Sequence, residues 1–397
     1  MTYYKLPSIQ ESILASQLKI RFDKFEKGKY LPICNSMSRY LLQVKNEIEN
    51  HYALWDNFKK YTNPYEFIHT PIPSLNISVS KYKPISRAFF KLIEIYNTHK
   101  ILKGNEPIKT FHLAEGPGGF IEATAVVRDN KYDKYYGITL IDKDSSNVPG
   151  WNKSKHFLDK YKNVLIENGK DGTGNLYNYD NFIYLHKKYG NKMDIITGDG
   201  GFDFSIDYNK QENNAYFLLF TQICYALILQ KRGGTFILKI FDIFKYKTVE
   251  LLYILSCFYK EVYIMKPYTS RYANSEKYVI CKDFKYSNVD YLISKIGTML
   301  KIFNSIQNNL DYNLISILDL NICSYYINSI KNINIVLGSQ QIENILYTIK
   351  LISMKDKKRD KIETIKANNI KKCIFWCSKN NINYNNLENK NSFLLDK

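Results

Sequence analysis

Residues Thr110–Val127 read TFHLAEGPGGFIEATAVV, and this stretch decides the fold. Its first half predicts a strand over Thr110–Glu115, and its second half predicts a helix. Between them stand three glycines within Gly116–Gly119, where the backbone can turn sharply and approach a nucleotide-like ligand closely. Their spacing differs from G-x-G-x-x-G, which makes a nicotinamide dinucleotide a poor candidate for that ligand. The stretch therefore indicates a strand–loop–helix unit of an α/β sheet.

Apolar runs that alternate with helical stretches surround this unit, between about residues 105 and 285. They predict further strands at Tyr135–Ile141, Asn163–Glu167, Asp194–Gly198, Gly234–Ile240, Glu261–Met265 and Lys277–Lys282. Too few residues separate the last two strands for a crossover helix, so we expect this pair to be antiparallel. The predicted fold class is α/β, with a doubly wound, Rossmann-like sheet of seven strands.

The flanks of the sheet carry helical periodicity and predict a chain of three parts. We expect a helical N-terminal extension over residues 1–85, the sheet domain over residues 86–286 and a helical C-terminal extension over residues 287–397. The longest apolar stretch, Tyr216–Leu229, is too short to cross a bilayer and contains Thr221 and Gln222. It predicts a buried helix and no membrane contact.

The chain has 397 residues, of which 45% are hydrophobic and 24% charged, and this is the composition of a globular protein. Its formal net charge of +18 favours a polyanionic partner, because clustered lysines and arginines attract phosphate at long range. An AT-rich genome is an equally good explanation, since Lys, Asn, Ile, Tyr and Phe are all abundant and only Lys355–Lys361 is densely basic. Both explanations remain open at this point.

The seven cysteines are scattered through the chain and odd in number, which predicts reduced thiols rather than a disulfide framework. None stands in a pattern typical of zinc ligands, so we expect no metal. The first ten residues, MTYYKLPSIQ, lack the basic and apolar segments of a signal peptide.

Three charged residues stand where the predicted strands meet one edge of the sheet. Asp199 follows the strand MDIIT in GDGGFD, Lys239 lies near the end of GGTFILKIFD, and Glu276 opens EKYVICKDF. Because an antiparallel strand begins where its parallel neighbours finish, all three side chains should converge. Charges of alternating sign gathered in a cleft are a stronger sign of function than any one of them.

Two further polar residues are less informative when each is considered alone. Lys91 lies in SRAFFKLIEI, Ser86–Ile95, which predicts a helix with an apolar packing face; Lys91 lies off that face and by itself predicts a solvated side chain. His112 lies inside the strand before the glycine loop, where a histidine is more often a hydrogen-bonded core residue than a catalyst.

The order and wording of these motifs resemble the FtsJ-like methyltransferases, which have a lysine in a similarly worded helix, then a glycine loop, then Asp, Lys and Glu. The residues that match this K-D-K-E tetrad position by position are Lys91, Asp199, Lys239 and Glu276. Further wording is similar to the cap-specific mRNA (nucleoside-2′-O-)-methyltransferases, especially short members of viral type: NPYE at 63–66, DGTGN at 171–175, QEN at 211–213 and KPYTSRYANSEKYVICK at 266–282. The resemblance extends over roughly residues 63 to 380.

The resemblance implies S-adenosyl-L-methionine as cofactor, capped RNA as partner, and transfer of the sulfonium methyl group to the ribose 2′-hydroxyl of a cap-proximal nucleotide. Lys239 is then the expected base that takes the hydroxyl proton. Lys91 and the positive sulfonium favour the neutral form that this base requires. Asp199 and Glu276 favour the charged form, so their expected task is to orient the two ammonium groups.

The resemblance also assigns binding residues. Those expected to hold the cofactor are Ala114, Glu115, Gly116, Pro117, Gly118, Gly119 and Phe120 in the loop, Asp142 or Asp144 at the ribose, and Asn175 and Leu176 near the adenine. Asn175 stands where relatives often have Asp, and its side-chain oxygen can still accept from the adenine amine. His112 also replaces an Asp of many relatives, so we expect no acidic contact to the cofactor from there. Asn213 and Asn274 match positions that touch RNA in cap enzymes, and a turn-forming role is the alternative for both.

Two other functions compete with this one. A methyltransferase for rRNA or tRNA riboses would carry the tetrad, but the cap-type wording argues against it. A non-catalytic RNA-binding subunit of a capping or polymerase complex would have no need of an intact tetrad. The short chain and its AT-rich composition indicate a large DNA virus or a protist. The expected location is cytoplasmic, in a viral factory or virion, for a viral protein and nuclear for a cellular one.

Overall fold

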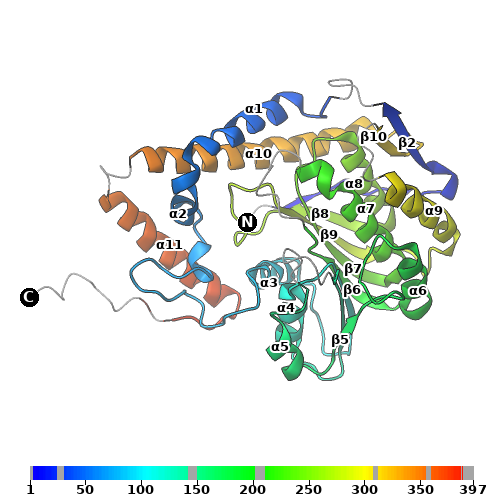
Figure 1. Cartoon of the computed structure of the whole chain (residues 1–397), viewed down its shortest axis with the longest axis horizontal. Coiled ribbons are helices and arrows are strands. Elements are labelled where there is room, and N and C mark those ends of the chain that lie inside the picture. Colours follow the sequence, from blue (N-terminus) through cyan, green and yellow to red (C-terminus); the bar gives the residue numbers. More distant parts are fainter. Residues whose placement is uncertain are drawn as a thin grey trace, which may run out of the picture.

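The computed structural model describes residues 3–24, 31–141, 150–201, 211–306, 312–354, 359–385 and 387. Figure 1 shows a twisted central sheet covered by helices, with an arm of helices extending to one side of it. The architecture is the predicted α/β, Rossmann-like one.

The central sheet has eight strands in the order β1-β8-β9-β7-β6-β3-β4-β5. Their bounds are β1 Tyr3–Lys5, β3 Lys109–Leu113, β4 Lys134–Ile138, β5 Val164–Glu167, β6 Met193–Gly198, β7 Gln230–Ile240, β8 Tyr259–Met265 and β9 Lys277–Phe284. Strands β5, β4, β3, β6 and β7 are parallel, and β9 lies antiparallel between β7 and β8. The seven strands and the antiparallel pair predicted from the sequence are thus confirmed. The eighth strand, β1, was not predicted; it extends the edge beside β8.

Helices cover both faces of this sheet. On one face lie α3 (Ala88–His99), α4 (Gly119–Arg128) and α5 (Lys155–Lys160), and on the other α6 (Tyr179–Tyr189), α7 (Gln211–Leu229), α8 (Tyr246–Phe258) and α9 (Asp290–Ile306). Helix α7 contains the long apolar stretch and is buried nearly all round, as predicted. Across the described part of the chain, no helix is long and apolar enough to span a membrane.

The flanking segments are mainly helical, as predicted, but they also contain strands that the sequence did not predict. Besides helices α1 (Asn35–Asn46), α2 (Tyr52–Thr62), α10 (Ser324–Ser353) and α11 (Arg359–Lys379), they contain β2 (Leu18–Lys24) and β10 (Tyr312–Leu318). These two strands form a separate antiparallel sheet. Each needs the other to pair its backbone, and nearly the whole chain separates them, so neither flank alone signals the sheet.

The N-terminal and C-terminal flanks pack on each other. Helices α1 and α10 lie side by side (Figure 1), and Met37 packs against the backbone at Gly338. Helix α11 attaches this arm to the sheet domain through Trp376, whose ring lies 5.9 Å from that of Phe90 on α3. The three-part division near residues 85 and 286 stays a prediction.

Candidate active site

Strand alternation directs two of the four predicted catalytic side chains to one face of the sheet. In β7, Phe236 and Leu238 pack into the core beneath α6 to α9, whereas Ile237 packs beneath α3. Lys239 therefore shares the α3 face with Ile237, because successive side chains of a strand point to opposite faces. The same rule places Glu276 with Tyr278 on the α3 side at the start of β9.

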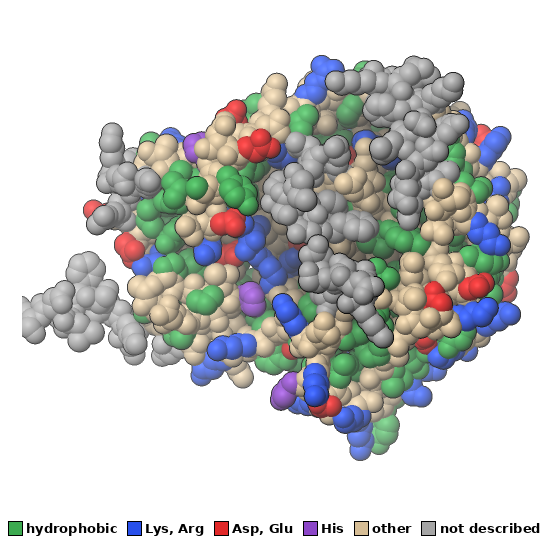
Figure 2. Space-filling view, in the orientation of Figure 1, with side chains coloured by type: hydrophobic (Ala, Val, Ile, Leu, Met, Phe, Trp, Pro, Cys, Tyr) green, Lys and Arg blue, Asp and Glu red, His purple; other side chains and the backbone are tan. Residues whose placement is uncertain are grey.

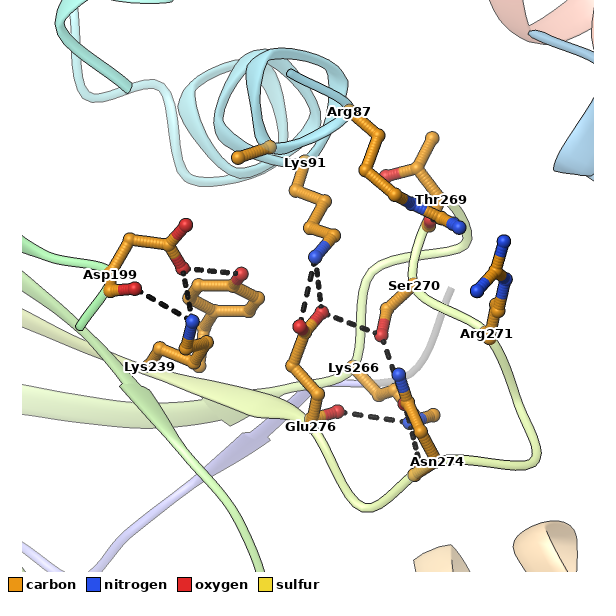
Figure 3. Close-up of polar contacts among 12 residues, drawn as sticks. Arg87, Lys91, Asp199, Lys239, Lys266, Thr269, Ser270, Arg271, Asn274 and Glu276 are labelled. Atoms are coloured by element: carbon orange, nitrogen blue, oxygen red, sulfur yellow. Dashed lines mark hydrogen bonds and ion pairs between the residues drawn. The ribbon is translucent and has the colours of Figure 1, made fainter. Parts of the chain in front are cut away.

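Lys91 and Glu276 form a close ion pair across this face. The Lys91 Nζ lies 2.7 Å from Oε1 and 2.8 Å from Oε2 of Glu276 (Figure 3). Burial disfavours ionisation of Glu276, but Lys91 and Lys239 outweigh it and hold the pKa of that carboxyl well below its usual range. Burial lowers the pKa of Lys91, and Glu276 partly offsets this. Glu276 is therefore ionised and holds the Lys91 ammonium group in place.

The burial of Lys91 contradicts its reading as a solvated residue. Its side chain is 9% exposed, because the loop that leads into β9 packs over this part of α3. The polar side of the helix therefore faces the polar groups of this loop instead of water. Position relative to the apolar face cannot distinguish these two environments.

Asp199 and Lys239 form a looser pair at the ends of β6 and β7 (Figure 3). The Lys239 Nζ donates to the backbone carbonyl of Asp199 at 2.6 Å and lies 3.3 Å from its carboxylate Oδ1. Tyr278, opposite Lys239 in the β7–β9 register, donates its hydroxyl to the same Oδ1 at 3.1 Å. Asp199 thus has two donors that fix its carboxylate beside the lysine.

The loop before β9 supports Glu276 from the other side. Ser270 Oγ donates to Glu276 Oε1 at 2.9 Å. Lys266 Nζ donates to the backbone carbonyls of Asn274 (2.6 Å) and Glu276 (2.9 Å) and to Asn274 Oδ1 (3.0 Å). Burial lowers the pKa of Lys266 to about 7. These contacts define the position from which Glu276 reaches Lys91.

The buried Glu115 carboxylate stabilises the glycine loop by hydrogen bonds. Its Oε1 accepts from the backbone N–H groups of Phe120 (2.7 Å) and Ile121 (2.8 Å), in the first turn of α4. Its Oε2 is buried and has no hydrogen-bond partner within the described parts of the chain. Burial raises the pKa of this carboxyl to about 8 in spite of the two donors. An unpartnered buried carboxylate oxygen suits a ligand that brings a positive charge.

The glycines of this loop are required by its shape. Gly118 has a φ of +116°, which side-chain-bearing residues rarely adopt, and a side chain at Gly119 would collide with Ser86 just before α3. The loop consequently lies between the end of β3 and the start of α3, next to Asp199 and Lys239, whose charges act on Glu115. The tetrad and the loop form one continuous site.

The geometry agrees with the comparison to protein families. A family model described as FtsJ-like methyltransferase matches residues 84–284, about half of the chain. The chain belongs to the FtsJ-like methyltransferase family. The matched segment contains all four tetrad residues and the whole glycine loop.

Curated relatives extend the likeness beyond this segment. Cap-specific mRNA (nucleoside-2′-O-)-methyltransferase 2 of Danio rerio is 26% identical over 291 residues, which make up 67% of this chain and 37% of that protein. Its namesake in Drosophila melanogaster is 30% identical over 224 residues, 53% of this chain and 31% of that protein. Cap-specific mRNA (nucleoside-2′-O-)-methyltransferase 1 of Mus musculus is 30% identical over 265 residues, which make up 64% of this chain and 31% of that protein. The chain thus spans about a third of the length of these relatives.

Two further residues predicted to hold the cofactor in this FtsJ-like domain, Asn175 and Leu176, follow β5. The segment before Asn175 joins the end of β4, where Ile141 N–H donates to the Thr173 carbonyl at 2.8 Å. Asn175 Oδ1 accepts from Tyr177 N–H at 2.9 Å, and the Leu176 side chain is buried in the core. Any contact of Leu176 with a cofactor would therefore come from its backbone. Asp142 and Asp144 lie outside the described residues, as do Phe202 and Asp203 of GDGGFD.

Three other predicted residues have defined partners. His112 is fully buried and its two ring nitrogens contact the hydroxyls of Thr110 (2.9 Å) and Thr197 (2.8 Å), which confirms it as a core residue. Asn213 is exposed and accepts from Lys245 Nζ at 2.6 Å. Asn274 is held by Lys266, as described above. Neither asparagine lacks a partner, so contact with RNA stays a prediction for both.

Sequence reasoning missed Tyr278 and Ser270. Tyr278 could have been found from strand alternation, because it lies two residues after Glu276 on the same face of β9. Ser270 could not, because its contact depends on the path of an irregular loop. All seven cysteines are free. No cluster of possible metal ligands occurs within the described ranges.

Proposed function

We propose that this protein is an S-adenosylmethionine-dependent RNA 2′-O-methyltransferase that modifies the ribose of a cap-proximal nucleotide of mRNA. The observation that carries the proposal is the meeting of Lys91, Asp199, Lys239 and Glu276, from four separate elements, at one edge of the sheet beside the glycine loop. The named activity of the relatives supports capped RNA as the substrate.

The residues present fit the cofactor. A loop of backbone groups at a strand end can surround the methionine part, and the unpartnered Glu115 Oε2 can accept from its ammonium group. Ala114–Phe120 would hold the methionine part, and Asn175 with the backbone of Leu176 the adenine. When bound, the cofactor supplies an electrophilic methyl group on a positively charged sulfur.

Lys239 is the residue placed to remove the proton of the ribose hydroxyl. The hydroxyl is a weak nucleophile, so a base within hydrogen-bond reach of it is needed. The Lys239 Nζ is anchored by the Asp199 carbonyl and carboxylate and is 13% exposed at the side chain. A Cβ at Gly201 would lie 3.0 Å from this nitrogen, so the glycine there leaves the approach open.

Lys91 and Glu276 act mainly by position and charge. The pair keeps one ammonium group close enough to Lys239 for the two lysines to repel each other. Asp199 and Tyr278 prevent Lys239 from leaving the strand edge. Holding hydroxyl and methyl group in line supplies most of the rate in such a transfer.

A methyl-transfer assay with tritiated cofactor tests the proposal. Capped RNA should be labelled, and the same RNA without a cap should be labelled far more slowly. Equal labelling of uncapped rRNA or tRNA transcripts would favour the internal ribose methyltransferase. Binding of RNA without any transfer would favour a non-catalytic subunit.

A further inference from the structure

Three charged side chains next to the tetrad have no part in this mechanism. Glu66 is almost fully buried, with a side-chain exposure of 1%, and accepts from Arg271 through Nε at 3.1 Å and Nη2 at 2.6 Å. Arg87 approaches the same carboxylate at 3.5 Å and donates through Nη2 to the Thr269 carbonyl at 2.8 Å. One carboxylate therefore holds two guanidinium groups.

Both arginines adjoin catalytic residues. Arg87 precedes Lys91 by one helical turn, and residues four apart lie on the same side of a helix. Arg271 follows Ser270, which donates to Glu276. Figure 3 shows the two arginines on the same side of the Lys91–Glu276 pair, away from Asp199 and Lys239.

The charges of this cluster do not cancel. Two guanidinium groups share a single carboxylate, and that carboxylate is hidden while the arginines are 27% and 31% exposed at the side chain. The Arg87 Nε is buried and has no hydrogen-bond partner within the described ranges. The part of this cluster that a ligand can meet is formed by the two guanidinium groups.

A hollow lies near this cluster, and His69, on which the charges of both arginines act, is part of its lining. It measures about 500 Å³, and its lining includes His69, Lys81, Tyr82 and Lys83 but no acidic side chain. Burial lowers the pKa of His69, and the positive charges of Arg87 and Arg271 lower it further, so this imidazole lies in the field of both arginines. Figure 2 shows several Lys and Arg side chains close together near the middle of the face in view.

We propose that Arg87 and Arg271 together bind a phosphate group of the substrate RNA adjacent to the methylated ribose, with Glu66 as the positioning residue for both. The proposal rests on the proposed function. A guanidinium fork matches two phosphate oxygens, and phosphate contacts set the register of a nucleic acid on a protein without reading its sequence. The reaction requires a fixed register of the RNA on the protein, because the ribose hydroxyl must lie next to Lys239.

Substitution of Arg271 tests this site. Arg271→Ala should weaken binding of a short capped RNA about tenfold or more at 0.15 M salt, since a charge-assisted contact is lost. The slope of log affinity against log salt should become shallower by about 0.7 to 1, as expected for one phosphate fewer. Arg271→Lys should keep most of the slope but lose affinity, because the fork is gone. Fluorescence anisotropy at several salt concentrations gives both quantities.

Two further variants serve as a charge control and as a substitute in case Arg271→Ala does not fold. Lys103→Ala removes one exposed positive charge from the loop before β3, at the opposite edge of the sheet, and should leave affinity and slope as in the wild type. If Arg271→Ala fails to fold because Glu66 loses its main partner, Glu66→Gln with Arg271→Gln removes the fork and its counter-charge together, while Arg87 keeps its bond to the Thr269 carbonyl. That double variant should show the same shallower slope.

The outcomes separate this site from the proposed function. Wild-type slope and affinity in folded Arg271→Ala, or in the double variant, would overturn the phosphate site while RNA methylation by the wild type still stands. The wild type could instead transfer no methyl group and still show a salt slope that becomes shallower in the Arg271 variants. That result would support the phosphate site and contradict the proposed function.

Discussion

The two ion pairs of the tetrad differ in how firmly their lysines are held. Lys91 reaches both oxygens of Glu276 at 2.7 and 2.8 Å, and that carboxylate also accepts from Ser270. Lys239 lies 3.3 Å from the nearest carboxylate oxygen of Asp199, and its shortest contact is a neutral carbonyl. Two short carboxylate contacts hold the Lys91 ammonium group in one position, whereas Lys239 has one longer carboxylate contact. We therefore propose a positioning role for the first pair and proton transfer for the second.

Removal of Lys239 should have the largest effect on the reaction. Lys239→Ala takes away the proton acceptor and should lower the rate of methyl transfer by about 10²–10⁴-fold. Cofactor affinity should change little, because the glycine loop belongs to β3 and α4. Adding Lys91→Ala should cost far less than the product of the single effects, since the four residues act as one unit. A folded Lys239→Ala that methylates at nearly the wild-type rate would reverse the roles of the two pairs.

Breaking the tight pair should affect stability as much as rate. Glu276→Gln leaves the Lys91 ammonium group buried without its counter-ion, which should cost about 3–5 kcal/mol of unfolding free energy and about ten- to a hundredfold in rate. Adding Lys91→Met should restore much of the stability but none of the rate. Denaturant unfolding of the three proteins checks this, and a Glu276→Gln as stable as the wild type would contradict a buried charged pair.

The same pair predicts a dependence of stability on pH. The pKa of Glu276 is lowered on folding, so its stabilising contribution is fully present above the ordinary glutamate value and is lost as pH falls through the lower folded value. Glu276→Gln should remove this component of acid destabilisation.

Glu115 borders the loose pair and should couple cofactor binding to a proton. Its pKa of about 8 leaves it mainly protonated at neutral pH, and a bound ammonium group would favour the ionised form. Binding should therefore release a proton and strengthen about tenfold between about pH 6.5 and 8.5. Calorimetry in buffers of different ionisation enthalpy measures the release. Glu115→Gln, which still accepts from the loop N–H groups, should bind without release, and unchanged proton release in that variant would exclude Glu115 as its source.

The hydroxyl of Tyr278 should have the smallest effect. Tyr278→Phe keeps the buried ring and removes the donor to Asp199 Oδ1. Because Lys239 retains the Asp199 carbonyl as its nearest anchor, we expect a drop in rate of only about three- to tenfold. Single-turnover rates with unchanged cofactor affinity would show it. A loss as large as that of Lys239→Ala would mean that the loose pair is held far more tightly than its distances indicate.

The sheet and the convergence of Asp199, Lys239 and Glu276 could be predicted from local patterns in the sequence, whereas Lys91 was added only by the family resemblance. Each strand is a continuous apolar run, and the end of a parallel strand fixes where Asp199 and Lys239 lie. The loop Gly116–Gly119 could be predicted because its glycines are residues that a sharp turn requires.

The remaining features depend on contacts between distant segments. Strand β1 has only three residues, and β2 becomes a strand only by pairing with β10. The burial of Lys91 and the contact from Ser270 to Glu276 depend on how one irregular loop folds over α3. No periodicity within a single segment reports such contacts.

The position of the methyl group on the product tests the central claim most directly. Capped RNA treated with the protein and S-adenosylmethionine would be digested to nucleosides and cap dinucleotides and analysed by mass spectrometry. The account predicts one added methyl group on the 2′-oxygen of a cap-proximal ribose with the wild type, and almost none with Lys239→Ala. A methyl group on a base, or on riboses throughout the RNA regardless of the cap, would contradict it.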